Sequence, residues 1–221
     1  MEILESITVN PDLEEIRERL HVTKDKEWRF VCDLIESAWP VIEPKAAYKA
    51  CIVTSKHGDK VKLGHTCLNS HVLRQQLEQS GQVFPYVVTI GKKLEDKIRT
   101  SGNILEQYYL DSIGNVALYA VLNSVENYLK LRYGFQCISS MAPGSLEDWP
   151  LKEQGPLFSI LGDVKTAIGV KLTEAFLMIP TKSESGIFFP TSNKFYSCQL
   201  CPRKNCPNRK TDYNKKGGIE I

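Results

Sequence analysis

Residues 104–132 carry apolar side chains almost all the way round a helical wheel. A helix with one apolar stripe lies on a protein surface, whereas a helix that is apolar on most sides is buried. We therefore predict a long central helix over residues 104–132, ended by Gly134. Gly114 lies inside it and costs about 1 kcal/mol relative to alanine, a cost that a close packing contact would explain.

Shorter helices are predicted from capping residues and helical spacing. Asn10 and Pro11 suit the cap and the first turn of one helix. A second helix, with apolar positions repeating over residues 28–39, ends at Pro40. The remaining helix predictions are a helix to Leu77 capped by Asn69-Ser70, a helix around Leu94 and Ile98, residues 151–161 capped by Asp148, and a turn ending at Gly169.

Apolar runs between these helices predict strands. Residues 83–90 are apolar enough to be buried on both faces of a sheet. Residues 46–53 and 60–67 flank a turn at residues 57–59. The other expected strands are residues 135–139, 170–179 and 186–189. Because strands and helices mix irregularly, this order predicts an α+β fold whose antiparallel or mixed sheet is flanked by helices.

Composition and charge exclude several classes of protein. The chain has 221 residues, 42% of them apolar, and a formal net charge of +2. So small a charge does not favour nucleic acid or an acidic membrane surface as a partner. The acidic, amphipathic first 20 residues do not resemble a signal peptide, and no segment has the roughly 20 apolar residues that span a bilayer. We expect a soluble, cytoplasmic protein.

Three of the seven cysteines form a C-x2-C-x4-C motif in the polar segment 191–221: Cys198, Cys201 and Cys206. Several thiolates on one short loop are typical of a metal or iron–sulfur site. Three thiolates suit an iron–sulfur cluster, whereas zinc needs a fourth donor such as Cys137 or a histidine. Exposed thiols that bind nothing are the alternative. We expect the segment to be disordered unless something cross-links it.

Motifs of common enzymes are missing from the sequence. There is no dinucleotide-binding GxGxxG after a strand, no P-loop, no HExxH and no GxSxG. None of the four histidines has an evident partner set for nucleophilic catalysis. The pattern alone therefore indicates no catalytic residues.

Four segments match one known family in order: Ala142–Gly144 (APG), 149–161 (WPLKEQGPLFSIL), 168–180 (IGVKLTEAFLMIP) and 182–196, which contains KSESGIFF and a predicted Lys194-Phe195-Tyr196 strand. These segments resemble the activation region of cobalamin-dependent methionine synthase. Upstream segments within residues 44–118 resemble free-standing members of that family, so the resemblance spans roughly residues 40–210.

The resemblance implies a curved antiparallel sheet with helices and S-adenosylmethionine as ligand. In the family this region docks over the corrinoid domain when cob(II)alamin is reduced and remethylated. It implies a corrinoid protein or corrinoid methyltransferase as partner, with cobalamin held by that partner. The chain would then be an accessory factor rather than a complete enzyme. An iron–sulfur centre would suit this role, because cob(II)alamin reduction requires an electron.

Six residues are candidate ligand contacts by this resemblance: Glu126, Ser140, Ala142, Gly144, Glu174 and Tyr196. The family's turn reads Arg-x-Ala-Pro-Gly-Tyr, and here Ser140 and Ser145 replace its arginine and tyrosine. Losing one charge-assisted contact costs about 1.5–3 kcal/mol. Glu126 and Glu174, the latter in a predicted strand, could instead be solvated charges, and Tyr196 could simply pack.

Residues 1–40 are expected to form a helical segment packed on an activation-like domain at 41–196, followed by a cysteine-containing tail at 197–221. The leading functional hypothesis is reactivation of a corrinoid protein. A non-catalytic module that only docks on such a protein is the first alternative. An iron–sulfur or metal electron-transfer protein that reuses the fold is the second.

Overall fold

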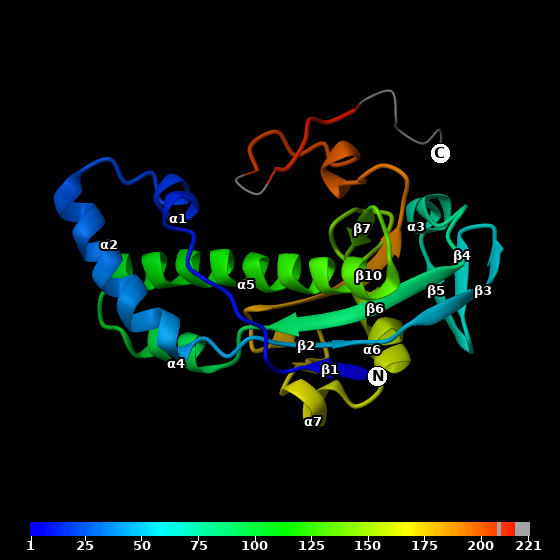
Figure 1. Cartoon of the computed structure of the whole chain (residues 1–221), viewed down its shortest axis with the longest axis horizontal. Coiled ribbons are helices and arrows are strands. Elements are labelled where there is room, and N and C mark those ends of the chain that lie inside the picture. The colour runs from blue at the N-terminus through cyan, green and yellow to red at the C-terminus, as the bar shows by residue number, and fades with distance from the viewer. Residues whose placement is uncertain (207–208, 215–221) are drawn as a thin grey trace.

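The computed structural model describes residues 1–206 and 209–214, which contain an eight-stranded antiparallel sheet (Figure 1). The strand β6 is central, because it pairs with β2, β3 and β10. The main-sheet strands are β1 Glu2–Leu4, β2 Lys45–Tyr48, β3 Cys51–His57, β4 Lys60–Leu63, β5 Thr66–Asn69, β6 Gln82–Thr89, β7 Ile138–Met141 and β10 Ser183–Pro190. A separate hairpin joins β8 Lys171–Leu172 and β9 Met178–Ile179.

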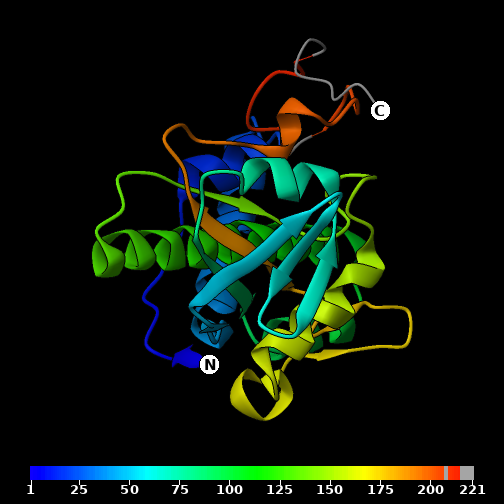
Figure 2. The same cartoon turned by 90° about the vertical axis from the view of Figure 1, so that its right-hand side faces the viewer.

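Helices cover both faces of this sheet, which confirms the predicted α+β class. The long helix α5 runs along one face, and α6 and α7 lie on the other (Figure 1). Figure 2 looks onto β3, β4 and β5 at one end of the molecule. The helices are α1 Leu13–Arg19, α2 Asp25–Ala38, α3 His71–Gln76, α4 Lys93–Thr100, α5 Ile104–Tyr133, α6 Gln154–Leu161 and α7 Val164–Ile168, with 3₁₀ turns η1 Trp39–Val41, η2 Leu151–Glu153 and η3 Ser197–Gln199.

The strand β6 is buried on both faces, as its apolar run predicts. Phe84, Tyr86 and Val88 pack with residues of α5 on one side. Val83 and Val87 face the other side, where they join residues of α6 and α7. This alternation of side chains places the main core between α5 and the sheet, and smaller apolar clusters on the opposite face of the sheet.

The central helix α5 matches its prediction closely. The side chain of Asn103 accepts hydrogen bonds from the backbone amides of Leu105 and Glu106 at its start. Gly134 ends the helix in the left-handed conformation, with φ 71°. A Cβ at Gly114 would lie 3.0 Å from Cδ2 of Leu94, so this glycine does allow the close approach of α4.

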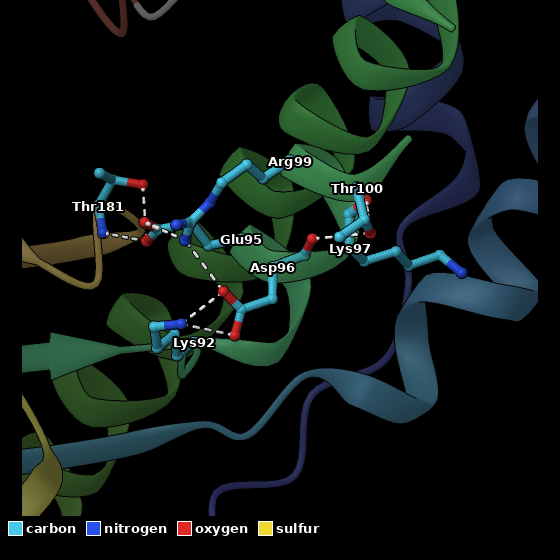
Figure 3. Close-up of polar contacts among 7 residues, drawn as sticks. All are labelled: Lys92, Glu95, Asp96, Lys97, Arg99, Thr100 and Thr181. Carbon is cyan, nitrogen blue, oxygen red and sulfur yellow. Dashed lines mark hydrogen bonds and ion pairs between the residues drawn. The ribbon is translucent and has the colours of Figure 1, made fainter. Parts of the chain in front are cut away.

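Polar contacts connect α4 to the segment before β10 (Figure 3). The carboxylate of Glu95 accepts hydrogen bonds from the backbone amide of Thr181, at 2.8 Å, and from its hydroxyl, at 3.2 Å. Next to it, Lys182 reaches α5, where its Nζ lies 2.7 Å from Oδ1 of Asp111 and 2.7 Å from Oδ1 of Asn115. These contacts fix where β10 begins relative to α5.

Two capping predictions are wrong. Helix α1 begins at Leu13 and is capped by Asp12, whose carboxylate accepts from the amide of Glu15, so Asn10 is not its cap. Asp148 does not cap the 151–161 segment either. Its carboxylate instead accepts hydrogen bonds from the Ser70 hydroxyl and from the first backbone amides of α3, because the fold places these donors beside it.

Several predicted strands differ in extent. The 46–53 run breaks between β2 and β3, and the 60–67 run turns at Gly64, with φ 60°, into β4 and β5. The 135–139 strand begins only at Ile138. The 170–179 strand is two short strands around a turn at residues 173–177. Residues 194–196 form no strand.

The N-terminal and C-terminal segments both pack on the rest of the molecule. Strand β1 joins the sheet edge by pairing with β2, and α1 and α2 lie against α5. The tail passes over the α5 side of the sheet (Figure 1). Residues 207, 208 and 215–221 of the predicted tail lie outside the described part. Among the described residues, no helix has the length and apolar character needed to cross a bilayer.

Candidate functional site

A group of polar and aromatic side chains, called the seam below, lies where β10 and the edge strand β7 meet the long helix α5. On β10, Glu184, Gly186 and Phe188 pair with Val88, Tyr86 and Phe84 of β6. Paired residues share a face of the sheet, and this face is the one that packs against α5. The seam therefore places a carboxylate, Glu184, next to the phenol of Tyr86 on the helix-covered side.

Gly186 makes room for the ring of Tyr86. A Cβ at Gly186 would lie 2.5 Å from the backbone oxygen of Met141 and 2.8 Å from the Tyr86 hydroxyl oxygen. The ring of Tyr86 stacks on Phe188 with centroids 4.2 Å apart. Any larger residue at position 186 would displace the phenol from this position.

Fully buried Tyr86 and half-buried Glu184 are a hydrogen-bonded pair of acidic groups. The Tyr86 hydroxyl donates to Oε1 of Glu184 at 3.2 Å. Burial raises the pKa of Glu184 above its ordinary value, although the Tyr86 hydrogen bond and the charge on Lys210 act in the opposite direction. Burial and the neighbouring Glu184 charge raise the pKa of Tyr86 well above its usual value, while a hydrogen bond with Ser140 opposes this rise. Of the two, only Glu184 is partly exposed, so it is the group that can hydrogen-bond a polar ligand.

The side of α5 that faces β10 carries polar residues at helical spacing, so they form one stripe. These polar residues begin with the two that contact Lys182 and continue to the C-terminal turns of the helix. The stripe consists of Asp111, Asn115, Tyr119, Glu126 and Lys130.

Glu126 is the most highly connected member of the stripe. Its Oε2 lies 2.5 Å from Nζ of Lys194, and its Oε1 lies 2.9 Å from Nζ of Lys130. Lys194 also donates to the backbone oxygen of Ile138 at 2.6 Å. Burial acts to raise the pKa of Glu126, but hydrogen bonds from the two lysines outweigh it, so the pKa is lowered. Two ammonium groups and one carboxylate leave a net charge of +1 here.

Tyr119 lies about two helical turns before Glu126 and is in contact with two other segments. Its ring has Cζ of Arg19 at 5.0 Å and Nζ of Lys210 at 5.4 Å from the centroid. Burial is the main reason that the pKa of Tyr119 is raised. Cations over an aromatic face are stabilising, so α1 and the tail are both held against α5 at this ring.

Most of the predicted ligand residues gather at the Glu126 end of the seam. Ser140 pairs with Phe188 and thus lies on the α5 side of the sheet. Tyr196 follows Lys194, whose Nζ lies 5.9 Å from the Tyr196 ring centroid. These residues come from α5, β7 and the segment after β10, and only the fold brings them together.

The Ala142–Gly144 turn lies at the end of β7. Gly144 has φ +86°, a left-handed conformation that favours glycine. The hydroxyl of Ser145 donates to the backbone oxygen of Ala142 at 2.6 Å and lies 3.4 Å from Oγ of Ser197. The turn is therefore in contact with the start of the cysteine-containing tail.

Glu174 does not join the other predicted residues. It is exposed in the turn between β8 and β9, so its placement in a strand is wrong. Phe176 of the same turn lies against α6, where a Cβ at Gly155 would be 3.3 Å from Cε1 of Phe176. Helix α6 covers the sheet face opposite to α5, so the sheet separates Glu174 from Glu126.

The tail cysteines Cys198, Cys201 and Cys206 are free and half-buried. Cys198 lies in η3, and the backbone amide of Cys201 donates to the Cys198 oxygen at 3.3 Å. Among residues 1–206 and 209–214, no three His, Cys, Asp or Glu side chains converge closely enough to hold a metal ion.

A groove of about 930 Å³ lies away from the seam, between the α3–β6 connection and the Gly134–Cys137 segment. Its walls are mainly glutamine, glycine and serine residues of 75–82 and 190–193. None of the predicted ligand residues lines it. We assign the functional site to the seam because the charged and aromatic groups converge there.

Sequence reasoning missed Tyr86, Tyr119, Glu184 and the ionic role of Lys194. Glu184 did carry a signal, since it is a charged residue within a strand whose next residues are apolar. Tyr86 gives no such signal, because its apolar neighbours make it indistinguishable from core. The pairing of Lys194 with Glu126 joins residues 68 positions apart.

Comparisons with known proteins establish the fold. No protein-family model matches the chain. No curated protein matches it either. Among solved structures, it resembles the "Crystal Structure of the MetH Reactivation Domain bound to AdoHcy", with a TM-score of 0.65 and 14% sequence identity. The match covers 90% of this chain and 81% of that chain, so the two share the same overall architecture.

Proposed function

We propose that this chain binds S-adenosylmethionine or S-adenosylhomocysteine at the polar seam and supports the reductive reactivation of a corrinoid protein. The observation that carries this proposal is the fold shared over 90% of the chain with a reactivation domain bound to AdoHcy. The seam supplies the polar and aromatic groups that such a ligand requires.

The charges of the seam suit the amino-acid end of the ligand. The cluster of Lys130, Glu126 and Lys194 has a net charge of +1, which attracts a carboxylate. Lys194 donates to the Ile138 oxygen, two residues from Ser140, so an ammonium group lies next to the serine that replaces the family's arginine. We infer that Lys194 takes over the charge of that arginine. Glu184, which Tyr86 holds by a hydrogen bond, is available for the ligand's amino group or hydroxyls.

The chain acts in this proposal as an accessory factor. The seam is built of ion pairs and aromatic rings, which suit binding and positioning of a ligand. Methyl transfer and reduction would take place at the cobalt of the partner. The role of this chain is to hold the ligand over the corrinoid.

Calorimetry with S-adenosylmethionine and S-adenosylhomocysteine tests the ligand. We expect micromolar binding by the wild type and a tenfold to hundredfold weaker affinity for Lys194→Met, the loss of one charge-assisted contact, about 1.5–3 kcal/mol. Lys194→Arg should retain much of the affinity. Lys171→Met, on exposed β8, is the matched control and should bind as the wild type does.

Absence of heat with either ligand would contradict this part of the proposal. Equal affinity of Lys194→Met and the wild type would contradict the assigned role of Lys194.

A second function is favoured by Ser140, which offers no charge to a ligand carboxylate. A chain that gives no heat but still binds a corrinoid protein would be a non-catalytic docking module.

A further inference from the structure

The described part of the tail, residues 197–206 and 209–214, is held together by one guanidinium group, although it has almost no apolar residues. Arg209 donates from Nη1 to the backbone oxygens of Cys198 and Thr211, both at 3.2 Å. Its Nη2 donates to the oxygen of Cys201, at 3.1 Å, and to that of Arg203. In the described residues, these bonds take the place of the hydrophobic core that the polar segment lacks.

This arrangement brings the backbones of the cysteine loop together. Cys198 and Cys201 are one 3₁₀ turn apart and both bind the Arg209 guanidinium through their carbonyls. The backbone amide of Arg209 donates to the Cys206 oxygen at 3.1 Å, so the third cysteine is held by the same residue. One arginine thus positions all three cysteines on one compact loop.

The sequence around the loop is basic. Arg203, Lys204, Arg209 and Lys210 lie within eight positions of one another, against one acid, Asp212. A cluster held by thiolates carries negative charge, and the same cations balance it.

We propose that Cys198, Cys201 and Cys206 bind a four-iron, four-sulfur cluster through three thiolates, with the fourth iron open to a ligand from outside the loop. The loop backbone is already shaped by Arg209, and all three thiols are free and half-buried. This site goes beyond the ligand seam and does not depend on it.

Zinc is the less suitable metal, because a structural zinc site takes four protein donors. Two of the possible fourth donors are engaged elsewhere. Sγ of Cys137 accepts a hydrogen bond from Thr191 at 3.7 Å, and Nδ1 of His71 lies 2.8 Å from Asp59. No group of three potential donors converges within the described residues, so either metal centre would have to draw the three thiols together, and the missing fourth donor is what disfavours zinc.

The cluster would lie near the rim of the seam. Lys210 of the same loop lies over the Tyr119 ring on α5, and Ser197 lies beside Ser145 of the β7 turn. The tail passes above α5 in Figure 1, on the face that carries Glu126. The open iron would therefore be on the ligand side of the molecule rather than on its far face.

Anaerobic reconstitution with ferrous iron and sulfide tests the cluster. We expect about four irons and four sulfides per wild-type chain, a broad visible absorbance, and a paramagnetic signal after reduction with dithionite. The variant Cys198→Ser/Cys201→Ser/Cys206→Ser should lose all three readouts. Cys67→Ser, on β5, is the matched control and should keep them.

Arg209→Lys separates loop shape from charge, because it keeps the charge but loses the planar fork. We expect it to fold, by circular dichroism, and to hold less than half of the wild-type iron. Equal iron in the triple variant and the wild type would overturn the proposal. So would one zinc per wild-type chain without iron or sulfide. These readouts do not involve S-adenosylmethionine, so they can fail or succeed independently of the proposed function.

Discussion

Glu184 shows how one residue makes the stability of this fold depend on pH. Its pKa is raised in the folded chain, above the ordinary value of 4.5. A raised pKa means that the folded state prefers the protonated form. The stability from this group is therefore complete below pH 4.5 and is lost as pH rises through the folded pKa.

The variant Glu184→Gln should remove this dependence, because glutamine is neutral at every pH and keeps an oxygen to accept from Tyr86. We expect Glu184→Gln to be more stable than the wild type at pH 7 and similar to it at pH 4. Urea unfolding at both pH values measures this difference. Exposed Glu147→Gln is the control. An equal difference at pH 4 and pH 7 would contradict the assignment of the pH effect to Glu184.

Local chemistry fixed some single residues and not others. The cap at Ser70 and the helix end at Gly134 were predicted correctly, because a cap contacts backbone only a few positions away. The partner of Glu126 could not be predicted, since Lys194 is brought to it by the path of β10 and β7. A short stretch of sequence contains both members of a cap contact, but it does not contain both members of the Glu126–Lys194 ion pair.

At the scale of elements, α3 depends on a distant segment for its N-terminal cap. Asp148 accepts hydrogen bonds from the Ser70 hydroxyl and, at 3.1 Å each, from the backbone amides of His71 and Val72. Ser70 in turn accepts from the Leu73 amide at 2.9 Å. Two residues that are 78 positions apart thus cap one helix together.

Asp148→Ala should lower the free energy of unfolding by about 1–2 kcal/mol, because it leaves these donors without their acceptor. Chemical denaturation measures the loss. The exposed neighbour Glu147→Ala is the control and should change stability by less than about 0.5 kcal/mol. A loss of the same size in both variants would show that Asp148 is not the effective cap.

Strand extents were less predictable than helices for a related reason. The apolar pattern of residues 46–53 continues through the point where β2 ends and β3 begins. Strand ends depend on the hydrogen bonds that the neighbouring strand offers. The run breaks opposite Pro85 of β6, which accepts from the Lys49 amide but has no N–H to donate. Helix α5 carries its own hydrogen bonds, so its bounds followed from its own residues.

At the scale of the whole molecule, the proposed function requires contact with a second protein. The chain should bind a cob(II)alamin-loaded corrinoid protein and change the absorbance of the cobalt when reductant and S-adenosylmethionine are supplied. Co-elution in gel filtration and visible spectroscopy measure the two effects. The corrinoid protein without cobalamin is the control. No complex and no spectral change would contradict the proposal.

The sequence by itself determined the α+β class, the central buried helix, the doubly buried strand β6 and the resemblance to the methionine synthase activation region. These properties depend on local hydrogen bonding and on the periodicity of apolar residues, and both can be recognised within short stretches of the chain. Only the tertiary structure decided that Glu126, Lys194, Tyr86 and Glu184 share one seam while Glu174 lies across the sheet. It also decided that Arg209 folds the cysteine loop. The physical reason is that ion pairs and buried hydrogen bonds act over a few ångströms in space, whatever the separation along the chain.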